Sequence, residues 1–108
     1  NNGTVLFKPT KAKDDQFRLT FEGAKSYFIG ENSDFSEDKG FALQPWTNVR
    51  FENASVILKY NSATAMGNYF FTQTNGNVVK VEYTFGYFLE SNKNLKINLH
   101  HSSLPYSL

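Results

Sequence analysis

The second half of the chain alternates between apolar and polar residues. The pattern is clearest at apolar positions spaced two apart, namely Val79, Val81, Tyr83, Phe85 and Tyr87. Because successive side chains of a strand point to opposite faces, this alternation predicts a half-buried strand over residues 78–89. Similar patterns predict strands over residues 63–73 and 95–104, and one bent strand or two short strands over residues 46–60.

The segments between these strands have the composition of tight turns. Asn75-Gly76 is the strongest hairpin signal in the chain, and residues 61–62 and 90–94 are polar. Strands joined by consecutive hairpins lie antiparallel to one another. The second half is therefore predicted to form an antiparallel meander.

The first half has helical spacing instead. Apolar residues four, three and four positions apart form one stripe, which consists of Phe17, Phe21, Ala24 and Phe28. This spacing predicts a helix that ends at Gly30, a residue type favoured at helix C-termini. A short strand over residues 4–8 precedes the helix, and residues 31–45 are expected to form a loop with a short helical turn. Residues 1–108 thus make one α+β domain.

Composition narrows the class of protein. The 108 residues suffice for one domain, and 11 Phe, 6 Tyr and 1 Trp supply much of its core. The net charge of +1 comes without the basic stripe that nucleic-acid binding needs, so we expect no nucleic-acid partner. No apolar run has the length of a membrane span, so we expect no membrane partner. The absence of cysteine excludes thiolate metal sites, and the cellular compartment stays open.

The candidate chemistry lies at the end of the chain, where the two histidines are adjacent. Residues two apart in a strand share a face, so His100 pairs with Ser102 and His101 pairs with Ser103. Each face then carries one imidazole and one hydroxyl, which suits a hydrogen-bonded pair. A metal site is disfavoured because the two imidazoles diverge. A structural histidine remains the commoner role at the end of a strand.

Strand alternation also predicts which pair faces the core. Ile97 and Leu99 share a face with His101 and Ser103, so this pair is expected in the pocket, near Tyr83. A β-bulge after Leu99 would turn the other pair, His100 and Ser102, inward.

Further candidates come from other segments. Tyr27 lies beside the helical stripe, where its phenol can donate into a cavity, and Thr10 follows the first strand. From the pattern alone, Tyr27 is as easily explained as a core residue as by a role in a cavity. For Thr10, a role as a turn residue is the commoner explanation. An aromatic face on the predicted sheet is expected to form the dry wall of a pocket, and it consists of Tyr69, Phe71, Tyr83 and Phe85.

Several segments resemble the iota-class carbonic anhydrases, a group of NTF2-like domains. They are residues 6–10, 27–28, 46–54, 65–71, 81–87 and 100–105, the last of which reads His-His-Ser-Ser-Leu-Pro. A more distant likeness is to the association domain of calmodulin-dependent kinase II. The resemblance implies a cone-shaped α+β fold, with a curved antiparallel sheet and the helix on its concave face. Such domains open with a long helix, which we expect in a segment before Asn1.

The resemblance also implies an activity, the reversible hydration of carbon dioxide to bicarbonate. The family's Thr, Tyr, His and Ser map to Thr10, Tyr27, one of His100 and His101, and the serine two residues later. Both metal-dependent and metal-free members are known, and the diverging histidines favour a reaction without a cofactor. A divalent metal such as Zn or Mn is the alternative. A homodimer or packing between tandem domains is expected, with the convex sheet face as the contact.

Two other functions compete with this interpretation. A non-enzymatic oligomerisation or small-anion-binding module would have the same fold. An isomerase or dehydratase acting on an apolar substrate would need a carboxylate or histidine base in the pocket, and no pocket carboxylate is evident.

Overall fold

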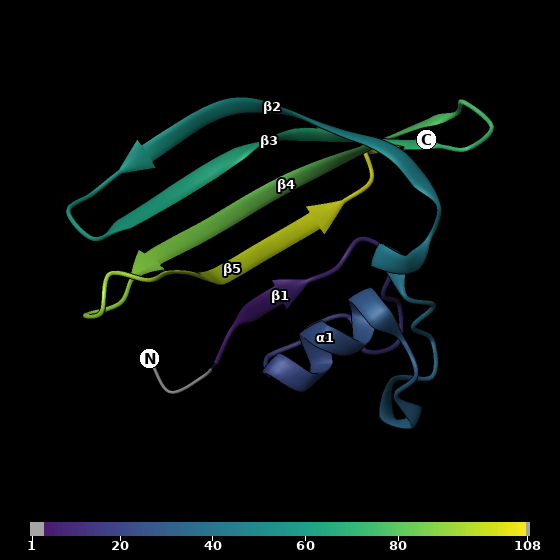
Figure 1. Ribbon diagram of the computed structural model, residues 1–108, viewed down its shortest axis with the longest axis horizontal. Helices are drawn as coiled ribbons and strands as arrows, with labels where there is room; N and C mark the ends of the chain where they lie inside the picture. Colours follow the sequence, from purple (N-terminus) through teal and green to yellow (C-terminus); the bar gives the residue numbers. More distant parts are fainter. Residues whose placement is uncertain (1–3, 108) are drawn as a thin grey trace.

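The structure is a computed structural model, and it describes residues 4–107. It contains one curved five-stranded sheet and one α-helix (Figure 1). The strands are β1 (Leu6–Lys8), β2 (Trp46–Leu58), β3 (Ser62–Gln73), β4 (Val78–Leu89) and β5 (Leu95–Ser103), and α1 spans Phe21–Ile29. Two short 3₁₀ turns follow the helix, η1 (Ser33–Phe35) and η2 (Phe41–Leu43).

The strand order in the sheet is β1-β5-β4-β3-β2. Strands β2 to β5 form the predicted antiparallel meander, and β2 is one long bent strand. The prediction of a wholly antiparallel sheet is wrong at one edge, because β1 pairs with β5 in parallel and Phe7 lies opposite His100. Hairpins determine strand direction only between neighbours in sequence. No hairpin joins β1 to β5, so packing alone decides their relative direction.

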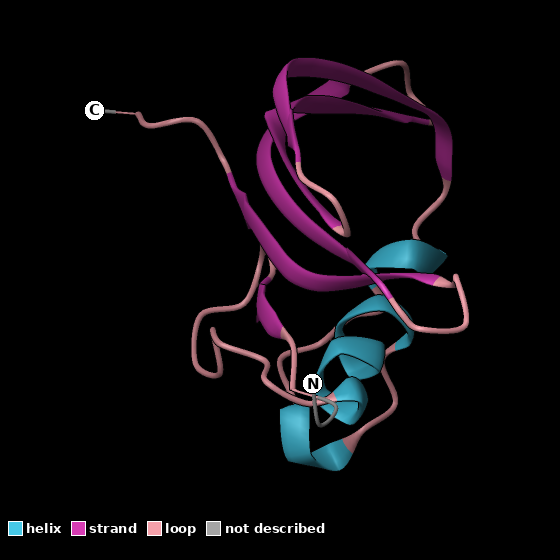
Figure 2. Cartoon of the chain, turned by 90° about the vertical axis from the view of Figure 1, so that its left-hand side faces the viewer, coloured by secondary structure: helices cyan, strands magenta, loops and turns pink. Residues whose placement is uncertain are grey.

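Within residues 4–107 the pairing register of the sheet shifts at three places, and a glycine faces two of them. The third shift, at Thr47 of β2, lies opposite Thr72 and Gln73. The register of β2 shifts at Ala54, opposite Gly67, and the register of β5 shifts at Asn98, opposite Gly86. A Cβ at Gly67 would lie 2.3 Å from the Glu52 carbonyl oxygen, so only glycine fits there. Bulges increase local twist and bend, which gives the sheet its strong curvature (Figure 2).

The helix α1 ends at Gly30 as predicted, and it begins after a threonine, a residue type favoured at helix N-caps. Thr20 is the N-cap and its side chain accepts a hydrogen bond from the Gly23 amide, while Gly30 ends the helix with a φ of 70°. The predicted apolar stripe is confirmed only in its second half: Phe17 precedes the helix and is 63% exposed and Phe21 is 70% exposed, whereas Ala24 and Phe28 are half-buried. The residues of α1 that are buried are Gly23, Ser26 and Tyr27.

A buried ion pair explains why the small, polar face of α1 is the one that packs. Arg18 is 1% exposed and forms two hydrogen bonds with the Asp38 carboxylate, at 2.8 and 2.7 Å. Ser26 donates to the same carboxylate at 2.5 Å. Removing one partner of such a buried pair typically costs about 3–5 kcal/mol. These contacts attach the helix to residues 31–45, while Phe28 of the apolar stripe stacks on Phe7 of β1.

The segment after β1 is fixed by a neighbouring carboxylate. Glu37 accepts hydrogen bonds from the backbone amides of Lys13, Asp14 and Asp15. These bonds, led by the one from Asp15, lower the pKa of Glu37 to about 2. Since Thr10 and Lys11 lie just before this segment, Glu37 also helps to fix one wall of the cavity described below.

The core lies on the concave side of the sheet, where α1 also lies (Figure 2). Its buried members come from β3 and β4 and are Ala65, Tyr69, Phe71, Val81, Tyr83 and Phe85. Tyr27 and Phe28 of α1 border the same space as Tyr69 and Phe71 of β3. In residues 4–107, no helix has both the length and the apolar character needed to cross a membrane.

Gly86→Ala is expected to destabilise the protein by about 1–3 kcal/mol, in the range of overpacked sites. The added Cβ would lie 2.8 Å from the Leu99 Cβ and 2.9 Å from Asn98 Oδ1, so the bulge in β5 has to deform. Chemical denaturation measures the change, and Lys80→Ala on the same strand is the control because Lys80 is exposed. Equal stability of the two variants would show that the bulge does not need a glycine opposite it.

Candidate active site

The bulge in β5 decides which histidine faces the cavity. Ile97 lies opposite Tyr87, and His100 lies opposite Phe85. Ile97 and His100 are three positions apart in β5, whereas their partners in β4 are two positions apart. The extra residue reverses the alternation, so His100 and Ser102 share the concave face with Ile97. The preference for His101 and Ser103 in the pocket is therefore wrong. A bulge after Leu99 is the alternative that the sequence leaves open, and the structure has the bulge just before Leu99, at Asn98.

His101 and Ser103 lie on the convex face of the sheet. They border a shallow hollow there together with Met66, Glu82 and Thr84. Ser103 Oγ donates to Glu82 Oε1 at 3.4 Å, and His101 is exposed. The two pairs of the His-His-Ser-Ser motif thus have different surroundings.

His100 is held between aromatic rings from the two strands beside it. Its ring stacks on Phe85 of β4 at a centroid distance of 4.2 Å and on Phe7 of β1 at 4.8 Å. Phe28 of α1 stacks in turn on Phe7 at 5.4 Å. This burial lowers the pKa of His100 to about 4, and the neighbouring His101 acts in the same direction. The imidazole is therefore neutral at pH 7.

Three polar side chains meet at the inner end of the cavity. Ser102 Oγ lies 3.0 Å from His100 Nε2, and Tyr69 Oη lies 3.2 Å from the same nitrogen. Tyr69 and Ser102 are also hydrogen-bonded to each other. Tyr83 and Phe85 of β4 lie opposite Ser102 and His100, which places this polar group directly over the aromatic core. A neutral imidazole with Nε2 unprotonated can accept a hydrogen bond from either hydroxyl, or from a water molecule that is to be deprotonated.

Thr10 and Tyr27 extend this polar group from the other wall. The Lys11 amide donates to Tyr27 Oη at 3.1 Å, so the Tyr27 proton is free to be donated elsewhere. Burial raises the pKa of Tyr27 to about 12, against the effects of the Lys11 amide and the Thr10 hydroxyl. Burial also raises the pKa of Tyr69, which interacts with the Ser102 and Thr10 hydroxyls. Both phenols therefore stay protonated and can act as donors.

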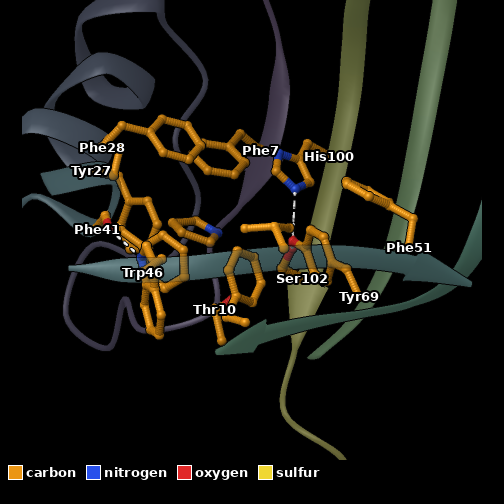
Figure 3. Close-up of a pocket in the computed structure, with 14 residues that line it drawn as sticks. Phe7, Thr10, Tyr27, Phe28, Phe41, Trp46, Phe51, Tyr69, His100 and Ser102 are labelled. Carbon is orange, nitrogen blue, oxygen red and sulfur yellow. Dashed lines mark hydrogen bonds between the residues drawn. The ribbon is translucent and has the colours of Figure 1, made fainter. Parts of the chain in front are cut away.

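These groups line an open, largely aromatic cavity of about 340 Å³. Figure 3 shows His100, Ser102 and Tyr69 at one end, and Tyr27, Phe41 and Trp46 at the other. Of the expected wall residues, Tyr69 and Phe71 line this cavity. Phe85 borders a second cavity on the far side of His100, and Tyr83 lies in the core with its hydroxyl bonded to Asn53. The site is thus a small polar group in an apolar chamber.

Sequence patterns alone did not assign a polar role to Tyr69 or a wall role to Phe41 and Trp46. The sequence predicts Tyr69 as part of the dry aromatic wall of the pocket, yet its hydroxyl is within hydrogen-bond distance of Ser102 and His100. One signal for the correct strand face was present, because a lone glycine inside a strand, such as Gly86, often marks a bulge in its partner. No sequence pattern indicates that η2 brings Phe41 against Trp46, at a centroid distance of 5.2 Å.

Within the described part of the chain, no three His, Cys, Asp or Glu side chains gather closely enough to hold a metal ion. His100 and His101 lie on opposite faces of β5, as the alternation predicts. The groups available for chemistry in the cavity are accordingly one imidazole and four hydroxyls, those of Thr10, Tyr27, Tyr69 and Ser102.

The architecture defines the class of protein first. An NTF2-like superfamily protein from Salmonella enterica serovar Typhimurium LT2 superimposes with a TM-score of 0.54 at 12% identity, covering 95% of this chain and 74% of that chain. Together with the curved sheet and the helix on its concave side, this likeness shows an α+β NTF2-like fold. The expected fold class is confirmed, apart from the parallel edge strand.

More specific matches identify the family. The model of the metal-independent carbonic anhydrases matches residues 1–104. The metal-independent carbonic anhydrase of Nostoc sp. (strain PCC 7120 / SAG 25.82 / UTEX 2576) is 45% identical over 105 residues, which cover 96% of this chain and 51% of the relative. The crystal structure of a cyanobacterial iota-carbonic anhydrase complexed with bicarbonate superimposes with a TM-score of 0.92 at 44% identity, over 98% of this chain and 65% of that chain.

This chain belongs to the metal-independent carbonic anhydrase family. It spans about half the length of the curated relative that it matches.

The stacked position of His100 predicts its titration. Its imidazole is expected to titrate with a pKa of about 4 in the folded protein, and near the ordinary histidine value of 6.5 in the urea-unfolded chain. Because the folded-state pKa is the lower one, the stability that a neutral His100 contributes is complete above pH 6.5 and is lost as the pH falls towards 4. NMR titration of the imidazole nitrogens measures both values. A folded-state midpoint near 6.5 would show that the ring is not desolvated.

Proposed function

We propose that this protein catalyses the reversible hydration of carbon dioxide to bicarbonate without a metal ion. The observation that carries the proposal is the contact of Ser102 and Tyr69 with His100 Nε2 inside an apolar cavity. It is supported by the family description and by the similarity to a carbonic anhydrase crystallised with bicarbonate. An apolar chamber suits carbon dioxide, and convergent hydroxyls suit the oxygens of the product.

The proposed base is the neutral His100. A water molecule held by Ser102 attacks the carbon atom of carbon dioxide, and a new C–O bond forms. One C=O π pair moves onto oxygen, and the water proton passes to His100 Nε2, directly or through the Ser102 hydroxyl. The protonated ring then releases its proton to solvent or buffer. This sequence requires the tautomer of His100 that carries its proton on Nδ1.

A pKa of about 4 makes His100 a weak base before the reaction begins. Negative charge develops on the carbonate oxygens beside the ring as the C–O bond forms. Attraction between this charge and the imidazolium raises the proton affinity of His100 in the transition state. The base therefore strengthens as the reaction proceeds, and it remains unprotonated over the physiological pH range.

Hydroxyl donors are proposed to stabilise the anion. Tyr27 and Tyr69 remain protonated because burial raises their pKa values, and Thr10 lies between them. Donors already aimed into a dry cavity need no reorganisation when charge develops. Zinc-dependent carbonic anhydrases instead lower the pKa of a bound water to about 7. Without that effect, we expect this enzyme to be slower than the zinc-dependent classes.

The two His–Ser pairs allow a matched test. His100→Ala is expected to lower kcat/KM for hydration by about 10²–10⁴-fold, the usual contribution of a general base. Ser102→Ala is expected to lower it by about 10- to 100-fold, through the loss of a hydrogen bond to a charged group. His101→Ala and Ser103→Ala are the controls on the opposite face, and they are expected to stay within about twofold of the parent. Stopped-flow hydration of carbon dioxide measures all four.

The same assay separates the competing interpretations. Activity that is unchanged after dialysis against a chelator supports the metal-free reaction, whereas loss and recovery with Zn or Mn would contradict it. If His100→Ala retains full activity, the proposed base is wrong. If the parent protein binds bicarbonate and has no hydration activity, the anion-binding module becomes the better interpretation.

We also propose that the protein forms a homodimer through the convex face of its sheet. Apolar side chains are exposed there, including Met66 at 57% and Ile57 at 61%. Burial of such a patch against a second copy favours association. Light scattering is expected to give the mass of a dimer, and Met66→Lys is expected to shift it to a monomer. Lys25→Ala, at an exposed position of α1 and away from the convex face, is the control; a monomeric parent protein would contradict the proposal.

A further inference from the structure

The cavity extends beyond the hydroxyls and the imidazole that the proposed reaction uses. Bicarbonate is smaller than benzene, and an apolar cavity of about 150 Å³ already holds benzene. The volume of about 340 Å³ is more than twice that. His100, Ser102 and Tyr69 lie at one end of the cavity, so space remains between a molecule bound at Ser102 and His100 and the rings of Phe41 and Trp46 at the other end (Figure 3).

The walls of this other end are flat aromatic rings, and we call it the aromatic annex. It is formed by Phe41, Ala42, Trp46 and Phe71. Phe41 meets Phe71 edge to face at a centroid distance of 5.2 Å, and Trp46 lies 5.2 Å from Phe71. Trp46 Nε1 donates to the Phe41 carbonyl oxygen at 2.9 Å, which fixes the indole plane. Such walls favour a planar ring through edge and face contacts.

A positive charge lies beside the annex. Lys11 Nζ is 5.9 Å from the centre of the Phe41 ring. This ammonium attracts anions towards the cavity, where the hydroxyls of Thr10, Tyr27 and Ser102 can donate to them. A carboxylate is bicarbonate with its hydroxyl replaced by a carbon group. A carboxylate bound at the hydroxyls would direct that carbon group away from His100, into the annex.

We propose that the cavity binds small aromatic carboxylates, with the carboxylate at the Thr10 and Ser102 hydroxyls and the ring in the aromatic annex. The carboxylate end of this inference rests on the proposed function, since it uses the same hydroxyls. The placement of the ring in the aromatic annex does not depend on the proposed function. Such ligands are expected to compete with bicarbonate and to inhibit carbon dioxide hydration.

Trp46 provides a direct readout of binding, because its ring is part of the annex. Benzoate is expected to change the Trp46 fluorescence saturably, and bicarbonate is expected to reverse the change. Acetate, which has no ring, is expected to bind about 10- to 100-fold more weakly, the factor for burying one phenyl-sized group. Benzyl alcohol, which has no carboxylate, is expected to bind more weakly than benzoate. Equal affinity for benzoate and acetate would overturn the proposal.

Two variants test the two ends separately. Ala42→Phe adds a ring to the wall of the annex, at an exposed position of the turn η2. It is expected to weaken benzoate binding at least tenfold and to weaken acetate binding less, because acetate has no ring to place in the annex. Ser102→Ala is expected to weaken benzoate binding and lower the hydration rate together. Benzoate binding that neither variant changes would place the ligand elsewhere and refute the assignment.

The fluorescence titration also separates the two proposals, because it does not depend on turnover. Hydration activity without benzoate binding would overturn the aromatic annex and leave the proposed function in place. Benzoate binding without hydration activity would overturn the proposed function and leave the aromatic annex in place. Competition with bicarbonate in the unsubstituted protein keeps the test decisive if a variant is unstable.

Discussion

The close approach of β5 to Gly86 in β4 is the constraint on which the candidate site depends. A side chain at position 86 would collide with Leu99 and Asn98, so glycine permits the bulge at Asn98. The bulge turns His100 and Ser102 to the concave face and leaves His101 and Ser103 on the convex face. One missing Cβ thus decides which of two chemically identical pairs enters the cavity. The same type of contact at Gly67 and Ala54 bends the sheet around that cavity.

The surroundings of His100 combine two opposing effects. Stacking between Phe7 and Phe85 removes water from the imidazole and lowers its pKa, which keeps it neutral and able to accept a proton. The same desolvation makes it a weak base until negative charge forms beside it. A dry aromatic chamber is favourable for an apolar substrate, and it strengthens the interaction between an imidazolium and an anion. Burial that weakens the base in the resting protein therefore assists it during the reaction.

The opposite wall depends on polar contacts far from the chemistry. The ion pair between Arg18 and Asp38 attaches α1 to residues 31–45, and Glu37 accepts hydrogen bonds from the backbone amides of residues 13–15. Tyr27 reaches the cavity because α1 is fixed through Gly23 and Ser26, and Thr10 reaches it because the following residues are held by Glu37.

Sequence patterns alone predicted the strands, the hairpin turns, the C-terminal end of α1 and the segments that carry the candidate chemistry. Those features depend on periodicity and on turn or capping residues, which act over a few positions. The sequence also determined that His100 and His101 lie on opposite faces, because alternation is a property of any strand. Local patterns carry this information since each involves only neighbours in the chain.

Only the tertiary structure decided which face of β5 points inward, because a one-residue bulge reverses every side chain beyond it. It also decided the parallel pairing of β1 with β5 and the packing of α1 through Tyr27 rather than Phe17 and Phe21. The hydroxyl of Tyr69 joined the site for the same reason, since its partner Ser102 is 33 positions away. These features depend on contacts between segments that are distant in sequence, and the periodicity of the chain carries no information about such contacts.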